Sequence, residues 1–169
     1  MDIKQRVDKS KYQVIPRTLC FLFSEELVLL IQYSSKKKDW AGKYNGIGGH
    51  IQQGESILSA ARREIQEETG LTINSLCLCG TVMINTGDMP GVVLHVFGKE
   101  LKTKPEIGLK HSAEGNVSWI SLGDLGDLPL MEDTPTLIEY TLAVLHGDRP
   151  AFSALYSYND QRELEITFS

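Results

Sequence analysis

Three glutamates, Glu64, Glu67 and Glu68, are crowded into five consecutive positions of the chain. In a helix, residues spaced i, i+3 and i+4 lie on one side, where a pair of like charges is destabilising by about 0.2–0.5 kcal/mol. Carboxylates so placed can direct their oxygens at one point, and oxygen is the ligand that Mg²⁺ prefers. The residues alone therefore indicate either a solvated acidic face or a divalent-metal site. No lysine follows at i+4, which disfavours the solvated face.

The surrounding segment, residues 56–69, has the features of a helix. Ser56 is suited to the N-cap position and Gly70 to the position just after the last turn. At 100° per residue, one arc of about 100° collects the apolar side chains that should be buried, namely Ile57, Leu58, Ala61 and Ile65. The three glutamates fall on a neighbouring arc, near the C-terminal end, where the helix dipole disfavours negative charge. Like-charge repulsion and an unfavourable position in the helix dipole both oppose this placement, and such joint violations of local preferences are typical of a functional site.

The rest of the chain predicts a mixed sheet packed between helices, an α+β fold of the α/β/α sandwich type. Apolar, partly β-branched runs predict strands, with a hairpin over 17–23 and 26–33, further strands within 71–85, 91–101 and 116–122, and a final hairpin within 149–169. Residues 34–55 are rich in glycine and polar residues, which predicts a loop containing one short strand. A second helix is expected over 132–147, capped by Asp133 or Thr134.

Bulk properties narrow the class of protein. The 169 residues predict one domain, and the net charge of -5 argues against binding to a nucleic-acid polymer. We expect no membrane association, because no apolar run approaches the roughly 20 residues of a membrane span, and a cytoplasmic location, because the polar N-terminus has no signal-peptide pattern. Three cysteines give no disulfide framework. Cys77 and Cys79 are expected to share one strand face as two packed thiols, with a metal or redox pair as the alternative.

The segment from Gly49 to Leu71 reads GHIQQGESILSAARREIQEETGL. Its fixed residues and their spacing resemble the Nudix box, and all nine specified positions match: Gly49, Glu55, Arg63, Glu64, Ile65, Glu67, Glu68, Gly70 and Leu71. The resemblance implies the Nudix fold, in which the box forms a loop–helix–loop. It also implies hydrolysis of a nucleoside diphosphate linked to another group, with Mg²⁺ as the cofactor and Mn²⁺ as a substitute.

The resemblance also implies roles for individual residues. Glu64, Glu67 and Glu68 would bind the metal, helped by the backbone carbonyl of Gly49. Glu55 and Arg63 would hold the loop and orient the ligands. Glu64 is a ligand or a general base. Glu114 precedes a Trp-bearing segment, as an additional acidic residue does in some relatives, and is a further candidate ligand or base; the alternative is an ordinary surface glutamate.

The residues around the box resemble the MutT-type 8-oxo-dGTP diphosphatases, which implies a small nucleotide as substrate, namely a nucleoside triphosphate such as 8-oxo-dGTP, with a nucleoside monophosphate and pyrophosphate as products. We expect a monomer or homodimer. Asn45 stands where that group has an Asn facing the purine, and an amide offers both a donor and an acceptor. Asp133 is a second candidate for base contact, with helix capping as the alternative. Lys38, in the run Lys36–Lys38, is a candidate phosphate contact, with a solvated loop as the alternative. ADP-ribose or dinucleotide hydrolysis, or regulatory nucleotide binding without turnover, are the other functions considered.

Overall fold

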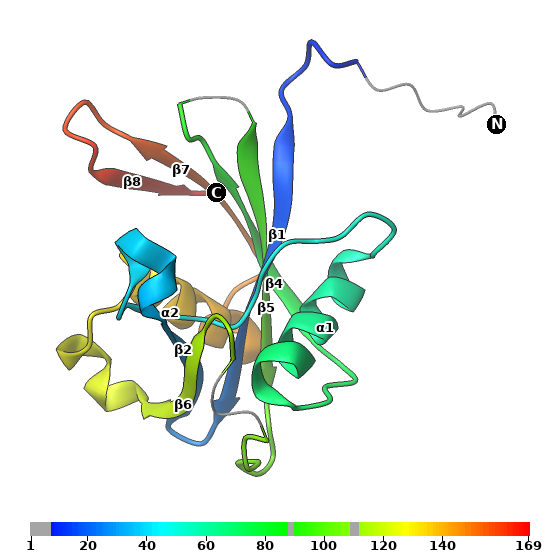
Figure 1. Ribbon diagram of the computed structural model, residues 1–169, viewed down its shortest axis with the longest axis vertical. Helices are drawn as coiled ribbons and strands as arrows, with labels where there is room; N and C mark the ends of the chain where they lie inside the picture. Colours follow the sequence, from blue (N-terminus) through cyan, green and yellow to red (C-terminus); the bar gives the residue numbers. More distant parts are fainter. Residues whose placement is uncertain (1–7, 88–89, 109–111) are drawn as a thin grey trace.

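The structure is a computed structural model that describes residues 8–87, 90–108 and 112–169 (Figure 1). Residues 1–7 of the polar N-terminus lie outside this description. The strands and helices follow in the order β1 (Val14–Ser24), β2 (Leu27–Tyr33), η1 (Ser35–Trp40), β3 (Tyr44–Asn45), α1 (Ile57–Thr69), β4 (Cys77–Ile84), β5 (Gly91–Glu100), β6 (Gly115–Ser121), η2 (Leu122–Asp127), α2 (Thr134–Leu145), β7 (Phe152–Tyr158) and β8 (Leu164–Phe168). Here η marks a 3₁₀ helix.

All the strands belong to one mixed sheet, in the order β3-β2-β1-β5-β4-β7-β8, with β6 paired to β2. The predicted hairpins form as expected: β1 pairs antiparallel with β2, and β7 with β8. The parallel neighbours are β1 with β5 and β4 with β7. The sheet is mixed because the chain returns to it both through tight turns and through longer connections.

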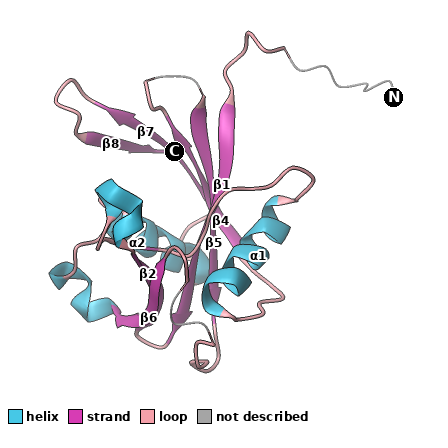
Figure 2. Cartoon of the chain, in the orientation of Figure 1, coloured by secondary structure: helices cyan, strands magenta, loops and turns pink. Residues whose placement is uncertain are grey.

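The two α-helices cover opposite faces of this sheet, as Figures 1 and 2 show. On the α1 face, Ala61 and Ile65 pack with buried residues of β1 and β2. On the α2 face, Leu137 and Ile138 pack with other residues of the same strands and of β4, β5 and β7. The predicted α/β/α sandwich is therefore confirmed. Among the described residues, no helix has the length and apolar character needed to cross a membrane.

One edge of β1 explains how the loop before α1 is held. Residues Leu22–Ser24 of β1 pair with β2, but the earlier part of the same edge pairs with the loop instead. Thr18 N–H donates to the Gly49 carbonyl at 2.9 Å, and Cys20 exchanges two backbone hydrogen bonds with Ile47. A Cβ at Gly48 would lie 2.1 Å from the Thr18 carbonyl oxygen, so this approach requires glycine. The loop is thus fixed to the sheet beside α1.

Several local features differ from expectation. The 3₁₀ helices η1 and η2 were not predicted, since six-residue turns of this kind carry no clear apolar period. The N-cap of α2 is Asp133, yet its side chain makes no capping hydrogen bond. Cys77 and Cys79 were expected to be two packed thiols, but Cys79 is buried whereas Cys77 is exposed. Cys77 is the first residue of β4 and lines an open hollow beside Leu145, whereas Cys79 lies within the core on the α2 side of the sheet.

Candidate active site

Helix α1 presents the three glutamates at different depths. Its ends are those predicted: the Ser56 hydroxyl accepts from Ser59 N–H, and Gly70 adopts the left-handed conformation with φ of 76°. Glu68 is buried at 3% exposure, and the Glu64 side chain is 13% exposed. The Glu67 side chain is 58% exposed. The buried face is thus wider than the apolar arc, because it takes in one carboxylate.

Arg63 connects the loop before α1 to two of the glutamates. Its Nε and Nη2 atoms donate to the two oxygens of Glu55 at 2.7 and 2.9 Å, which is the bidentate geometry of strong arginine–carboxylate pairs. Nη1 donates to Glu64 at 2.8 Å and to Glu67 at 3.1 Å. Nη2 also donates to the His50 carbonyl at 3.0 Å. Hydrogen bonding to Arg63 holds the pKa of Glu55 down to about 2.

Glu68 has little to compensate its burial. Gly48 N–H donates to its Oε2 at a long 3.3 Å. Burial raises the pKa of Glu68 to about 8, and the negative charges of Glu64 and Glu114 add to the rise. Burial likewise raises the pKa of Glu64, although Arg63 opposes this change. A carboxylate in such surroundings is favoured in its charged form only if a cation comes close.

Gly49 brings the loop backbone against Glu64. A Cβ at this position would lie 2.6 Å from Glu64 Oε1, so only glycine leaves room for the carboxylate. The Gly49 carbonyl accepts from Thr18, and a carbonyl oxygen has a second lone pair. The predicted roles of Gly49 and Glu64 therefore involve groups that lie next to each other.

Glu114 reaches the same region from the segment before β6. Its Oε2 is 2.6 Å from Lys37 Nζ, and its charge contributes to the raised pKa values of Glu64 and Glu68. Lys38, the lysine proposed from the sequence, is exposed. Lys37 is the neighbouring lysine that forms the ion pair, and sequence reasoning missed it because three consecutive lysines give no sign of which one turns inward.

The donor set of this region has the chemistry that a hard divalent cation requires. Glu64, Glu68 and Glu114 offer carboxylate oxygens as metal ligands, and their negative charges repel one another. Among the described residues, the buried Glu68 accepts one long hydrogen bond, from Gly48 N–H. Within residues 8–87, 90–108 and 112–169, no three His, Cys, Asp or Glu side chains are gathered closely enough to hold a metal ion. Arg63 holds Glu64 and Glu67 at its guanidinium, so these two carboxylates would have to turn toward the cation.

Asn45, in β3, stands just before the loop whose Gly48 contacts Glu68. Its Oδ1 accepts from Gly46 N–H at 2.8 Å and from the Thr134 hydroxyl at 3.0 Å. Its Nδ2 donates to the Tyr33 hydroxyl at 3.4 Å. Asp133 precedes Thr134 in sequence, and burial raises its pKa. The two predicted base contacts, Asn45 and Asp133, are therefore neighbours, because β3 hydrogen-bonds to the segment that leads into α2.

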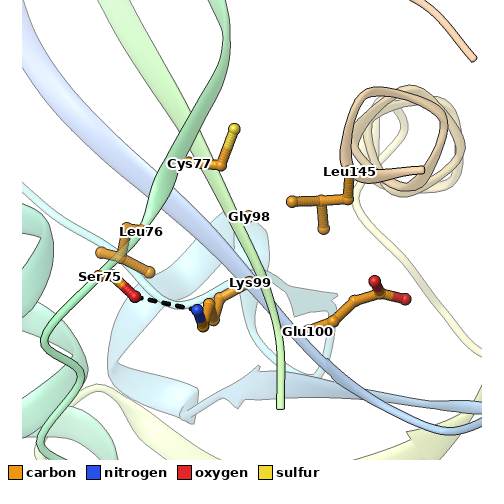
Figure 3. A pocket seen from close by; sticks show the side chains of 7 residues that line it. All are labelled: Ser75, Leu76, Cys77, Gly98, Lys99, Glu100 and Leu145. Atoms are coloured by element: carbon orange, nitrogen blue, oxygen red, sulfur yellow. Dashed lines mark hydrogen bonds between the residues drawn. The ribbon is translucent and has the colours of Figure 1, made fainter. Parts of the chain in front are cut away.

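A hollow of about 390 Å³ lies elsewhere, where the start of β4 meets the end of β5 and the last turn of α2. Figure 3 shows Lys99 reaching Ser75, with Cys77 and Leu145 drawn above this pair. None of its lining residues belongs to the predicted site. The carboxylates of α1 instead face the loop and Glu114.

A loop–helix–loop that carries three glutamates, packed on a mixed sheet between two helices, places the protein in a class of α/β/α sandwich proteins with an acidic box. Within this class, the chain belongs to the Nudix family, whose NUDIX domain matches residues 14–140. The match takes in the loop, α1, β3 and the first half of α2. The family resemblance inferred from the box is thereby confirmed.

Relatives with assigned names are similar over part of the chain. An oxidized purine nucleoside triphosphate hydrolase of Danio rerio is 41% identical over 78 residues, which cover 42% of this chain and 50% of that protein. The protein of the same name from Mus musculus is 34% identical over 85 residues, covering 49% and 53%. The chain thus spans about half the length of these two curated relatives.

Solved structures share the fold over most of the chain. A MutT protein from Bacillus halodurans aligns with a TM-score of 0.72 at 27% identity, covering 92% of this chain and 98% of that one. The Nudix domain of Shewanella oneidensis NrtR, complexed with ADP ribose, aligns with a TM-score of 0.70 at 22% identity, covering 83% and 94%. At that lower identity the likeness establishes the fold alone.

Proposed function

We propose that this protein is a Mg²⁺-dependent Nudix pyrophosphohydrolase that acts on a nucleoside triphosphate, with 8-oxo-dGTP as the leading candidate substrate. Water and the triphosphate would give a nucleoside monophosphate and pyrophosphate, as one phosphoanhydride bond breaks and one P–O bond forms. The observation that carries the proposal is Glu68, a buried carboxylate with one long hydrogen bond beside Glu64 and Glu114. The intact box and the oxidized purine nucleoside triphosphate hydrolases among its relatives support it.

The carboxylates would hold the cation. Glu68 is fixed by burial and by Gly48 N–H, and Glu64 lies against Gly49, whose carbonyl has a remaining lone pair. Glu67 is exposed and is free to turn from Arg63 toward an incoming metal–substrate complex. When bound, divalent cations neutralise the charge of the polyphosphate and assist in-line attack of water on phosphorus.

Arg63 and Glu55 would orient these ligands. Their bidentate pair fixes the guanidinium, whose remaining N–H groups reach the His50 carbonyl and the two glutamates. Partners that orient metal ligands in this way typically matter nearly as much as the ligands. Either Glu64 or Glu114 would accept the proton released by the attacking water.

The substrate's phosphates and base would lie on two sides of the site. Lys37 and Lys38 belong to η1, and Lys37 already lies beside Glu114, so this basic turn is suited to phosphate contact. Asn45 and Asp133 are suited to base contact, since they neighbour each other at the start of α2. An oxidised purine offers several donors and acceptors to such polar groups.

The test separates the hydrolysis products chromatographically for a panel that includes 8-oxo-dGTP, dGTP, dATP, ADP-ribose and a dinucleotide polyphosphate, with Mg²⁺ and then with EDTA, and pyrophosphate is the product expected from the triphosphates. We expect chelator-sensitive release that is fastest for 8-oxo-dGTP. Glu67→Gln and Glu68→Gln should each abolish turnover while the circular dichroism spectrum is retained. Glu139→Gln is the matched control, because Glu139 lies exposed on α2, and it should leave turnover unchanged.

Activity retained in both box variants would overturn the proposal. Turnover of ADP-ribose or a dinucleotide without turnover of triphosphates would show that the proposed substrate is wrong and that the proposed site is right. Tight nucleotide binding without any product would favour a regulatory binding domain over an enzyme.

A further inference from the structure

The orientation of the Asn45 side-chain amide is fixed by its neighbours. The oxygen and nitrogen of an amide look alike, so their assignment must come from hydrogen bonding. A backbone N–H can only donate, and Gly46 N–H is 2.8 Å from the atom assigned as Oδ1. That atom is therefore the acceptor, and Nδ2 is the atom beside the Tyr33 hydroxyl, at 3.4 Å.

Thr134 reinforces this orientation from a distant part of the chain. Its hydroxyl, on a residue with 0% exposure, is 3.0 Å from Asn45 Oδ1 and must donate to it. Thr134 is the first residue of α2, and its own N–H donates to the Met131 carbonyl. The amide of Asn45 is thus held by the start of α2 as well as by its own loop.

These contacts occupy both acceptor positions of the Asn45 Oδ1 atom but leave one N–H of Nδ2 without a partner among the described residues. Two donors occupy Oδ1, whereas Nδ2 carries two protons and gives one to Tyr33. Asn45 is only partly buried, so the remaining N–H can meet a ligand. Asn45 contacts Tyr33 of β2 on one side and Thr134, the first residue of α2, on the other.

We propose that Thr134 is a positioning residue that makes Asn45 a hydrogen-bond donor, so that the site selects purine nucleotides with a carbonyl on the base edge over those with an amino group. Guanine and hypoxanthine present an acceptor oxygen at position 6, where adenine presents an N–H donor. The inference rests on the proposed function and deepens it. A donor fixed in place would discriminate because an amino group facing it leaves both donors unpaired.

The experiment compares Thr134→Val, which keeps the shape but removes the hydroxyl, with Thr134→Ser, which keeps the hydroxyl. KM and kcat are measured for dGTP and dATP. In Thr134→Val, where one bond from the adjacent Gly46 would remain, we expect the preference for dGTP to fall about tenfold through KM, the loss of a hydrogen bond worth about 1.4 kcal/mol. Thr134→Ser should keep the native preference.

A second arm separates positioning from general damage. In an Asn45→Ala background, Thr134→Val should no longer change the preference, because its target is gone. Equal increases in KM for both nucleotides, or an unchanged ratio in Thr134→Val, would overturn the inference. Binding of dGMP and dAMP, measured by calorimetry, should show the same loss of preference. If no triphosphate is hydrolysed, the proposed function fails, while this binding comparison still decides the role of Thr134.

Discussion

At the residue scale, the buried carboxylate of Glu68 is expected to destabilise the metal-free protein. It is buried, and the one hydrogen bond it accepts from the described residues is 3.3 Å long. Such groups are found where function opposes stability, because an uncompensated carboxylate is destabilising in the interior. This predicts a stability gain from removing the charge, opposite to the effect on turnover.

We expect Glu68→Gln to stabilise the protein in EDTA, and more so as the pH rises. The folded pKa of about 8 lies above the ordinary value of 4.5, so the folded state binds more protons than the unfolded one. The fold is therefore weakened as the pH rises from about 4.5 to about 8. Thermal unfolding at pH 5 and pH 8.5 should show a small and then a clearly positive increase in Tm. Glu139→Gln should give no such trend, and a variant less stable than the native protein at pH 8.5 would contradict the argument.

Arg63 is predicted to act through its fork of donors as well as through its charge. Lysine keeps the charge but cannot form the bidentate pair with Glu55 or reach Glu64 and the His50 carbonyl together. We therefore expect Arg63→Lys to lower kcat/KM by about 10- to 100-fold, as is typical when a group that orients metal ligands is lost. Arg62→Lys is the neighbouring control, since exposed Arg62 contacts only the Asn74 carbonyl in the described structure. An Arg63→Lys variant whose kcat/KM is as little changed as that of Arg62→Lys would show that the positive charge alone matters.

At the element scale, the sequence predicted those features whose causes are local. The ends of α1 were found because Ser56 and Gly70 act within one turn of the helix. The register shift in the β4–β5 pairing was not found, because alternation gives no sign of an extra residue until the partner strand is known. The same limit applies to Lys37, whose partner Glu114 is brought close by the sheet and η1, and to Thr134, whose partner Asn45 lies on β3.

The different burial of the two cysteines in β4 leads to a prediction about thiol reactivity. Cys77 is exposed beside the hollow drawn in Figure 3, whereas Cys20 and Cys79 are at 0% exposure. Burial raises the pKa of the Cys79 thiol to about 12 and that of Cys20 still further. Brief treatment with iodoacetamide should therefore alkylate Cys77 alone, as read by peptide mass spectrometry. Cys77→Ser should abolish the rapid modification, and early labelling of Cys79 would contradict its burial in the core.

At the scale of the whole molecule, the site depends on elements far apart in the chain. The loop and α1 supply the box, the segment before β6 supplies Glu114, and the start of α2 supplies Asp133 and Thr134. The sequence predicted a mixed sheet between helices, but it could not show that β1 shares one edge between β2 and the loop. That arrangement depends on tertiary contacts, and it places Gly48 and Gly49 beside the glutamates.

The continuity of the sheet predicts that the chain unfolds as one unit. The family match ends at residue 140, yet β7 carries Phe152, Ala154 and Tyr156 into the same core as β1 and α2. Phe168 of β8 stacks on Tyr140 of α2 with ring centroids 3.8 Å apart. We therefore expect urea unfolding followed by far-ultraviolet circular dichroism and by tryptophan fluorescence to give coincident curves, because both tryptophans lie outside β7 and β8.

Phe152→Ala tests this coupling, since truncating a buried phenylalanine costs about 3–5 kcal/mol. The Phe152 side chain lies in the core that β7 shares with α2, where it contacts Tyr140 edge-to-face. Both unfolding curves should move together to lower urea. Leu155→Ala, on the exposed side of the same strand at 48% exposure, is the control and should move neither appreciably. A Phe152→Ala variant that shifts the dichroism curve but leaves the tryptophan curve in place would show that the C-terminal hairpin unfolds separately from the sheet that carries the box.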